Sequence, residues 1–327
     1  MAKRIFVAGD TLPASQLNAE VKTTFGGDGS DGALNISSGT TTIDCANAAV
    51  VIKQYTSISI TGTGKLAFSN PNTNGTIIIL KSQGDVTLTS SQTPMIDCAN
   101  MGAAGGTALS GATGVVNGND GNDGNGFLAT ISKGKGGFGG SSIHVGSSQA
   151  GGSAAIKVQL TSYISKYYQV APGSGGGGGG KDQSNGTSNP AAGGRGGGGL
   201  IVECAGALNF TTSSGISVAG ANGTNATVGT STQCGLGGGS GGGGGFCLIL
   251  YNSLTSASGT VTVSGGAAGS GASTGISSGL ASPWGSSGGG SMANTGTTSL
   301  QGTDTTAADG VTGGDGIAII AQNKDIA

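Results

Sequence analysis

Hydrophobic and polar residues alternate along short segments between residues 33 and 100. The alternation is clearest in Ala33-Leu-Asn-Ile-Ser, Ser57-Ile-Ser-Ile-Thr and Asp85-Val-Thr-Leu-Thr. Because successive side chains of a strand point to opposite faces, this pattern predicts strands with one buried face. Turn signals such as Gly62-Thr-Gly64 and Asn70-Pro71 separate these segments. The region 33–100 is therefore predicted to be a strand-rich shaft or solenoid.

One helix is predicted, within an N-terminal segment that spans residues 1–32. Leu12, Leu17 and Val21 recur near helical spacing, and Pro13 suits the first turn of a helix that begins after Asp10. The three apolar residues would form one face of this short helix.

An internal repeat occupies much of the region 101–327. One copy runs from Gly196 to Val218 and another from Gly241 to Val263, so their glycine runs begin about 45 residues apart. Each copy is a glycine run, a hydrophobic strand, a short turn, a second strand and a glycine-rich excursion. We predict that residues 101–327 form a glycine-rich repeat domain with strand modules.

The composition excludes several classes of protein. Glycine supplies 72 of the 327 residues, which excludes helical bundles, and only 6 prolines accompany it, without the regular period of collagen. The 13 basic and 15 acidic residues leave a net charge of −2. This balance argues against a nucleic-acid partner, which would require a basic surplus. The tract 205–303 carries no charged residue.

The glycine runs have an ordered and a flexible interpretation. The run Gly237–Gly245 lies directly before the hydrophobic strand Phe246–Leu250, which is unusual for a linker. Glycine chains can adopt the polyproline II helix, with three residues per turn, and bond their backbone groups to neighbouring chains. We expect ordered polyglycine II layers, with flexible loops as the alternative. Two triplets show the three-residue glycine period: Gly26, Gly29 and Gly32, and Gly118, Gly121 and Gly124.

The expected fold class is therefore all-β. It comprises elongated β-solenoid or β-sandwich-like repeats with glycine-rich polyglycine II layers and one short N-terminal helix. No run of about 20 apolar residues predicts a membrane span.

Catalytic and cofactor chemistry is sparse. The chain has a single histidine, His144, and we expect no catalytic residue, no cofactor and no metal. Aspartates in glycine-rich turns leave calcium open as an alternative to ordinary turn stabilisation. These aspartates are Asp28, Asp31, Asp120, Asp123 and Asp315.

Five cysteines are expected to be small buried thiols, although a Cys204–Cys247 disulfide is an alternative. Cys45 and Cys98 share the pentapeptide Ile-Asp-Cys-Ala-Asn at 43–47 and 96–100. The repetition predicts equivalent places on successive structural units.

Aromatic residues are scarce, so their loop positions suggest binding. Trp284 lies in a glycine- and serine-rich context, and Tyr163, Tyr167 and Tyr168 cluster before a glycine run. We take these four as candidate receptor-binding residues, with small apolar caps as the alternative.

The segment Ala8-Gly-Asp-Thr-Leu-Pro-Ala-Ser-Gln-Leu-Asn18 resembles the start of tailed-bacteriophage tail-fibre and tail-tip proteins. The modules Gly196–Val218 and Gly241–Val263 resemble glycine-rich phage adhesins that present polyglycine II layers. This resemblance implies a non-enzymatic virion structural protein that binds a host receptor, either a glycan or an outer-membrane protein. It also implies tail or baseplate partners, attachment through Leu12, Leu17 and Val21, and a homo-oligomer, by analogy a trimer.

Two other functions stay open. One is a self-assembling extracellular or cell-surface filament subunit, and the other is a tailspike that degrades polysaccharide. The N-terminus lacks the apolar stretch of a signal peptide. We therefore expect synthesis in a host cytoplasm and a final location in the virion tail, without membrane insertion.

Overall fold

Strands and extended chains make up the fold. The computed structural model describes residues 25–107, 114–116, 121, 137, 171–183, 188–189, 191–211, 215–230, 234–274, 288–289 and 308–323. This part is all-β, with essentially no helix, as the alternating pattern predicted. The helix expected within 1–32 falls on residues 1–24, outside the described residues.

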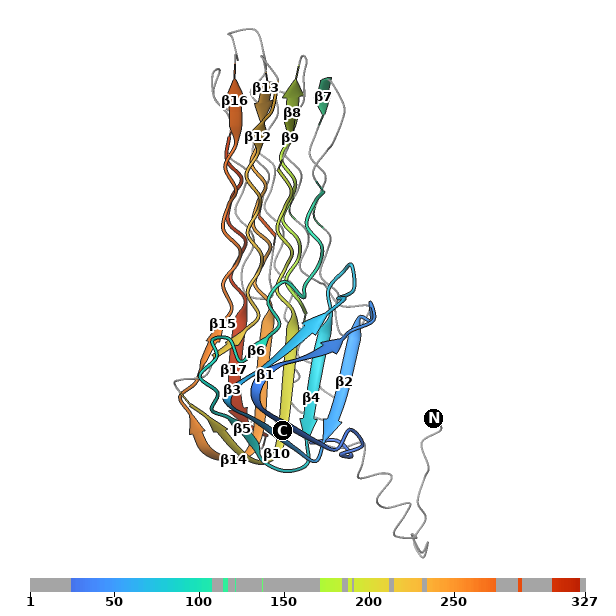
Figure 1. The fold of residues 1–327 in the computed structure, drawn as a ribbon, viewed down its shortest axis with the longest axis vertical. Coiled ribbons are helices and arrows are strands. Elements are labelled where there is room, and N and C mark those ends of the chain that lie inside the picture. Colours follow the sequence, from blue (N-terminus) through green and yellow to red (C-terminus); the bar gives the residue numbers. More distant parts are fainter. Residues whose placement is uncertain are drawn as a thin grey trace, which may run out of the picture.

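The base of the molecule is an 11-stranded sheet in which every strand pair is parallel (Figure 1). Its strands are β1 (Ala33–Asp44), β2 (Val50–Tyr55), β3 (Ser57–Ser69), β4 (Ile77–Ser82), β5 (Val86–Leu88), β6 (Ile96–Asp97), β10 (Gly199–Phe210), β11 (Gly215–Ser217), β14 (Phe246–Ala257), β15 (Thr260–Thr262) and β17 (Ile317–Gln322).

Three parallel ladders organise these strands. Ladder 1 joins β2, β4, the first half of β10, the first half of β14, and β17. Ladder 2 joins the first parts of β1 and β3 with β5 and the second halves of β10 and β14. Ladder 3 joins the second parts of β1 and β3 with β6, β11 and β15. Each pass of the chain therefore lies beside the preceding pass.

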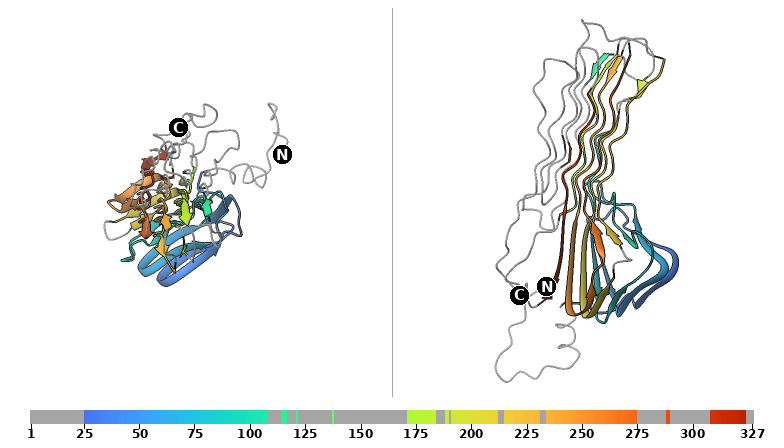
Figure 2. Two further views of the ribbon diagram at one scale, coloured as in Figure 1. Left: turned by 90° about the horizontal axis from the view of Figure 1, so that it is seen from above. Right: turned by 90° about the vertical axis from the view of Figure 1, so that its left-hand side faces the viewer.

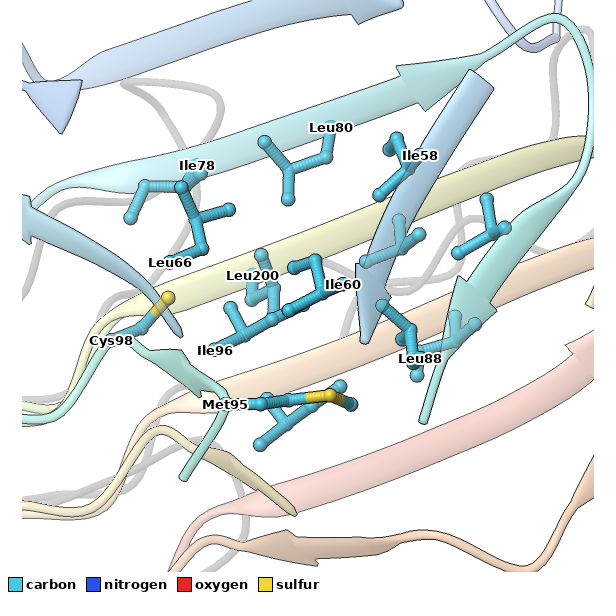
Figure 3. Close-up of a cluster of buried hydrophobic side chains, with 14 of the residues drawn as sticks. Ile58, Ile60, Leu66, Ile78, Leu80, Leu88, Met95, Ile96, Cys98 and Leu200 are labelled. Carbon is cyan, nitrogen blue, oxygen red and sulfur yellow. The ribbon is translucent and has the colours of Figure 1, made fainter. Parts of the chain in front are cut away.

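Aligned rows of apolar side chains fill the space that the ladders enclose (Figure 3). One row in ladder 2 contains Leu34, Ile58, Val86, Leu208 and Leu254 in register. Its three middle members are at most 2% exposed. Each time the chain returns to ladder 2, its apolar residues pair with apolar residues of the preceding strand. This constant register explains why the alternating pattern recurs along the sequence. Strands from 33–100 and from 101–327 share this core.

Glycine-rich chains rise from the base as a long arm (Figures 1 and 2). Short strands lie near the far end of the arm. A four-stranded antiparallel sheet contains β7 (Gly114–Val116), β8 (Lys181–Gln183), β13 (Cys234–Leu236) and β16 (Ala272–Thr274). A separate pair contains β9 (Ser188–Asn189) and β12 (Thr227–Val228).

The triplet Gly26, Gly29 and Gly32 does not belong to this arm. All three residues have φ between +69° and +87°, a left-handed backbone conformation that glycine adopts in turns. Their three-residue spacing therefore reflects successive turns before β1, and the prediction of a polyglycine II period there was wrong.

Candidate functional site

The glycine arm is the most distinctive feature that the structure describes. The predicted receptor-binding residues Trp284, Tyr163, Tyr167 and Tyr168 lie outside the described residues. So do the predicted attachment residues, which are Leu12, Leu17 and Val21. The site is therefore built here from the backbone of the arm and the side chains that border it.

The chain 237–245 lies at the centre of the arm and donates all nine of its amide hydrogens to neighbouring chains. Every third residue donates to the same neighbour, at N–O distances of 2.7–3.2 Å. The donor–acceptor pairs are Gly237 to Gly180, Ser240 to Gly177 and Gly243 to Ser174; Gly238 to Ala308, Gly241 to Val311 and Gly244 to Gly314; and Gly239 to Thr224, Gly242 to Ala221 and Gly245 to Val218.

Carbonyls of the same chain accept bonds from further neighbours. Gly239 and Gly242 accept from the chain 263–271, whereas Ser240 and Gly243 accept from the chain 191–198. Gly241 accepts from Gly289. Backbone hydrogen bonds with a period of three residues thus join the central chain to six surrounding segments, and the Ser240 Oγ atom also accepts from Val311 N at 2.9 Å.

This packing leaves no space for side chains at many glycines. A Cβ atom placed on Gly242 would collide with the carbonyl group of Arg195, and one on Gly266 would collide with that of Ala221. Because the obstructing atoms are backbone, they cannot rotate away. The glycine content of the sequence is therefore a steric requirement of the arm.

Side chains complete the hydrogen bonds at the border of the arm. The peripheral chain 263–271 directs Gly266 and Gly269 inward to the central chain. On one flank Asn222 and Asn225 accept from Ala267 and Ser270, each at 2.8 Å. On the other flank, Asp315 and Asp309 accept from Gly265 at 2.9 Å and Gly271 at 2.8 Å. Asn and Asp side chains thus supply the acceptors that backbone carbonyls supply to the central chain.

We predict that Asn222→Ala weakens this border locally. The Ala267 amide would lose its acceptor, at a cost of about 0.5–1.5 kcal/mol, and its hydrogen exchange would accelerate. Asn222→Asp keeps an acceptor oxygen at the same place and should preserve slow exchange. Hydrogen exchange resolved at Ala267 measures the difference, and equal exchange rates in the two variants would contradict this role.

A half-buried arginine, Arg195, lies where the arm meets the base. The Arg195 Nη2 atom donates to the Asn72 carbonyl at 2.7 Å, while its Nε is buried without a hydrogen-bond partner. Burial lowers the pKa of the guanidinium from its ordinary value. The contact ties the arm chain 191–198 to the turn before β4.

The Asp and Asn of the repeated pentapeptide have matching roles at two turns, although Ala46 has a positive φ and Ala99 does not. Asp44 Oδ1 accepts from Ala46 at 2.8 Å, and Asp97 Oδ1 accepts from Ala99 at 3.1 Å. Asn47 and Asn100 both have φ of 60°. In each copy the cysteine between the aspartate and the asparagine, Cys45 or Cys98, lies in the apolar core. The two copies thus form similar turns at the ends of ladder 3 strands, but not at equivalent register positions, because Asp97 lies in register with Ala67 and Thr42 whereas Asp44 lies beside Ser69.

All five cysteines are free and buried, so the alternative of a Cys204–Cys247 disulfide was wrong. The register places Cys204 beside Tyr251 and Cys247 beside Leu200. Four residues of strand separate the two thiols by about 13 Å, whereas bridged Cα atoms lie within about 7 Å.

The thiols are predicted to be unreactive in the folded protein. Burial raises the pKa of Cys45 and Cys204 to about 11, that of Cys247 to about 12, and that of Cys98 well above its usual range. A disulfide reagent at pH 8 should modify these four thiols only after unfolding. Because the unfolded thiols ionise near pH 9.0, the free energy of unfolding should fall as the pH rises above this value. Rapid modification of the native protein would contradict the prediction.

The described carboxylates have structural partners. Asp28 accepts from Ser30, Asp31 pairs with Lys53, and Asp85 accepts from Ala207. Lys65–Asp97 and Lys81–Glu203 form ion pairs at 2.7 and 3.0 Å. Within the described ranges, no group of three or more His, Cys, Asp or Glu side chains could hold a metal ion. Asp120 and Asp123 lie outside those ranges.

No helix in the described part of the chain is long and apolar enough to cross a membrane. The comparisons with known proteins leave this arrangement without a relative: no family model, no curated protein and no solved structure matches the chain.

Proposed function

We propose that this protein is a virion structural protein, a tail-fibre or tail-tip adhesin that attaches a tailed bacteriophage to a receptor on its host without catalysis. The observation that carries the proposal is the arm itself: its central chain bonds every amide to a neighbour, and its close packing leaves no room for a Cβ atom at many glycines. Such an arm is suited to presenting its far end at a distance from the base. Tail or baseplate proteins and a host surface receptor are its partners.

We further infer that the arm is a polyglycine II bundle and the base a short three-sided β-solenoid. The three-residue hydrogen-bond period supports the first inference, since it is the period of the polyproline II helix. The three in-register ladders around the larger apolar cluster support the second, and a further apolar cluster that includes Ile77 and Phe246 packs on the opposite face of ladder 1. In this arrangement the base anchors the arm, and the glycine chains stiffen it.

The roles of the acidic side chains favour attachment over sugar cleavage. A glycoside hydrolase of the usual kind needs two carboxylates flanking a substrate bond. Asp44, Asp85, Asp97 and Glu203 are instead engaged with backbone amides or lysines. The tailspike alternative predicts that the protein releases sugar from host polysaccharide. It also predicts that replacing one pair of acidic residues abolishes this release.

Immunogold labelling and adsorption assays test the proposal. Antibodies raised against the purified chain should label the tails of virions from the phage that carries this reading frame. The same antibodies, and an excess of purified chain, should reduce adsorption of that phage to its host. Unlabelled virions with unchanged adsorption would overturn the proposal. Long open-ended filaments of the purified chain under negative stain would instead support the filament subunit.

A further inference from the structure

Ladder 1 has a second apolar face, which points away from the main core. Its side chains come from every strand of the ladder, and we call them the outer face: Val50, Ile77, Ile79, Ile201, Phe246, Leu248, Leu250, Ile317, Ile319 and Ala321. The residues that alternate with them, such as Leu200 and Ile249, lie in the main core. Several central positions of the outer face are buried: Leu248 is 6% exposed and Leu250 is 7% exposed.

The described residues leave this burial unexplained. Ile52 lies in register in the same row as Leu248, yet it is 51% exposed at the edge of the ladder. Of the described apolar residues outside the ladder, only Phe25 and Ala171 belong to the outer-face cluster. Ala171 contributes a single methyl group, and Phe25 is itself only partly buried. The burial of Leu248 and Leu250 therefore requires a further part of the chain.

Ala171 is the point at which residues 138–170, which lie outside the described ranges, end on this face. The residue before their other end is also placed: Gly137 N donates to Gly175 O at 2.9 Å, in the arm chain 171–180. Gly175 lies four residues beyond Ala171, about 12 Å along a chain of this type. The chain 171–180 runs from the base towards the far end of the arm (Figure 1). We therefore expect the residues before Ala171 to approach it from the base.

The sequence of residues 155–170 matches an apolar surface. Ile156, Val158 and Leu160 alternate with polar residues, so a strand over these positions has one apolar face. The segment contains two charged residues, whereas residues 1–24, which precede Phe25 of the same cluster, contain five. Charged groups are costly to take out of water, so the segment with fewer of them is the better partner for a hydrocarbon surface.

The internal repeat leads to the same segment. In its two clear copies a glycine run is followed directly by a strand of ladder 1, either β10 or β14. A looser copy has Gly151 and Gly152 shortly before the alternating residues 155–160. No strand fits between the inner strands of ladder 1, because β4 pairs directly with β10 and β10 with β14. An apolar strand outside the ladder buries its side chains only against another apolar surface.

We propose that residues 155–170 pack against the outer face of ladder 1 and bury it. A six-residue strand of the ladder spans about 20 Å, whereas residues 155–170 reach about 50 Å when extended, so they can run along this face more than once. Tyr163, Tyr167 and Tyr168 then pack on the base as apolar caps, and receptor binding falls to other residues. The proposal concerns the fold of the base and does not rest on the proposed attachment function.

Site-specific photo-crosslinking of the full chain tests this proposal. Benzoylphenylalanine replaces Ile201, which lies at the centre of the outer face and is only partly buried, so the larger side chain causes little disturbance. Its main crosslink, located by mass spectrometry, should fall within residues 155–170. The matched control carries the same group at Thr87, on the outward side of ladder 2, and should lose this crosslink.

Three results would overturn the proposal. The first is a main crosslink to residues 1–24, which would assign the outer face to the N-terminal segment. The second is a crosslink between chains, detected by mixing isotope-labelled and unlabelled protein, which would assign the face to a second copy. The third is the absence of any crosslink from the Ile201 position. Circular dichroism establishes that each variant is folded, and benzoylphenylalanine at Ile319, in the same row, repeats the test if the Ile201 variant is not.

The fluorescence of ANS, a dye that binds exposed apolar surface, gives an independent readout. The triple variant Ile156→Ser, Val158→Ser and Leu160→Ser should increase this fluorescence, because the outer face loses its apolar partner. The matched control replaces the three polar residues that alternate with them and should leave the fluorescence unchanged: Lys157→Ser, Gln159→Ser and Thr161→Ser. Equal fluorescence of the two triple variants would contradict the proposal. These outcomes are separate from the adsorption assays, which test attachment to the host.

Discussion

Replacing Gly242 by alanine is expected to destabilise the protein by about 3 kcal/mol or more. The new Cβ would collide with the carbonyl group of Arg195. The amide of Gly242 donates to Ala221 and its carbonyl accepts from Gly266, so a shift of this chain disturbs two neighbours at once. Urea unfolding followed by circular dichroism measures the loss.

Gly39→Ala is the control for this substitution. No atom lies within 4 Å of a Cβ placed on Gly39, but its φ is +69°. Alanine at this position should therefore lower the free energy of unfolding by only about 1 kcal/mol, the cost of a left-handed backbone conformation. A Gly242→Ala variant as stable as Gly39→Ala would show that the arm tolerates side chains and would contradict its close packing.

Phe210→Ala is expected to cost about 3–5 kcal/mol, because it removes a large side chain from a filled core. Phe210 is fully buried, and it lies in register with Leu88 on one side and Ala257 on the other. A Cβ on Gly259 would meet its ring, so the chain beyond β14 packs directly on Phe210. A small side chain at this place leaves a cavity between successive passes. Thermal unfolding gives the measurement.

Ile52→Ala provides the comparison for this core variant. Ile52 is 51% exposed at the edge of ladder 1, so its truncation should cost no more than about 1 kcal/mol. If both variants lost the same stability, the proposed continuity of the core rows through Phe210 would be wrong.

Strand positions such as those of β3 were readable from the sequence because one face of the strand is buried and the other is not, whereas Ile77–Leu80 of β4 and Phe246–Leu250 of β14 are buried on both faces. Ile58 and Ile60 alternate with serines, and the structure buries the isoleucines. The pentapeptide repeat also indicated two similar turns, because the hydrogen bond from an amide to the aspartate two residues before it is a local interaction. The Gly26–Gly32 spacing was misleading, because glycine recurs every third residue in consecutive turns as well as in polyglycine chains.

Contacts between residues far apart in the sequence could not be predicted from such local patterns. Gly26 N donates to Glu203 Oε2 at 3.0 Å across 177 residues, and no local pattern marks that contact. The roles of Asn222 and Asp315 as border acceptors also depend on which chain lies next to them. The three-residue spacing of Asn222 and Asn225 was the only signal that could have identified such a border.

The sequence by itself determined that this protein is built from short apolar strands and from glycine chains that need close backbone contact. It could not determine which glycine chain lies beside which, because one glycine amide is chemically identical to another and carries no side chain to specify a partner. The tertiary structure decides this through the base. Gly245 continues directly into Phe246, whose register against Gly199 and Ile317 is fixed by the strand ladders and the apolar core. The side chains of the base thereby set the order of the arm chains, and the few side chains of the arm, such as Asn222 and Asp315, add acceptors at its border.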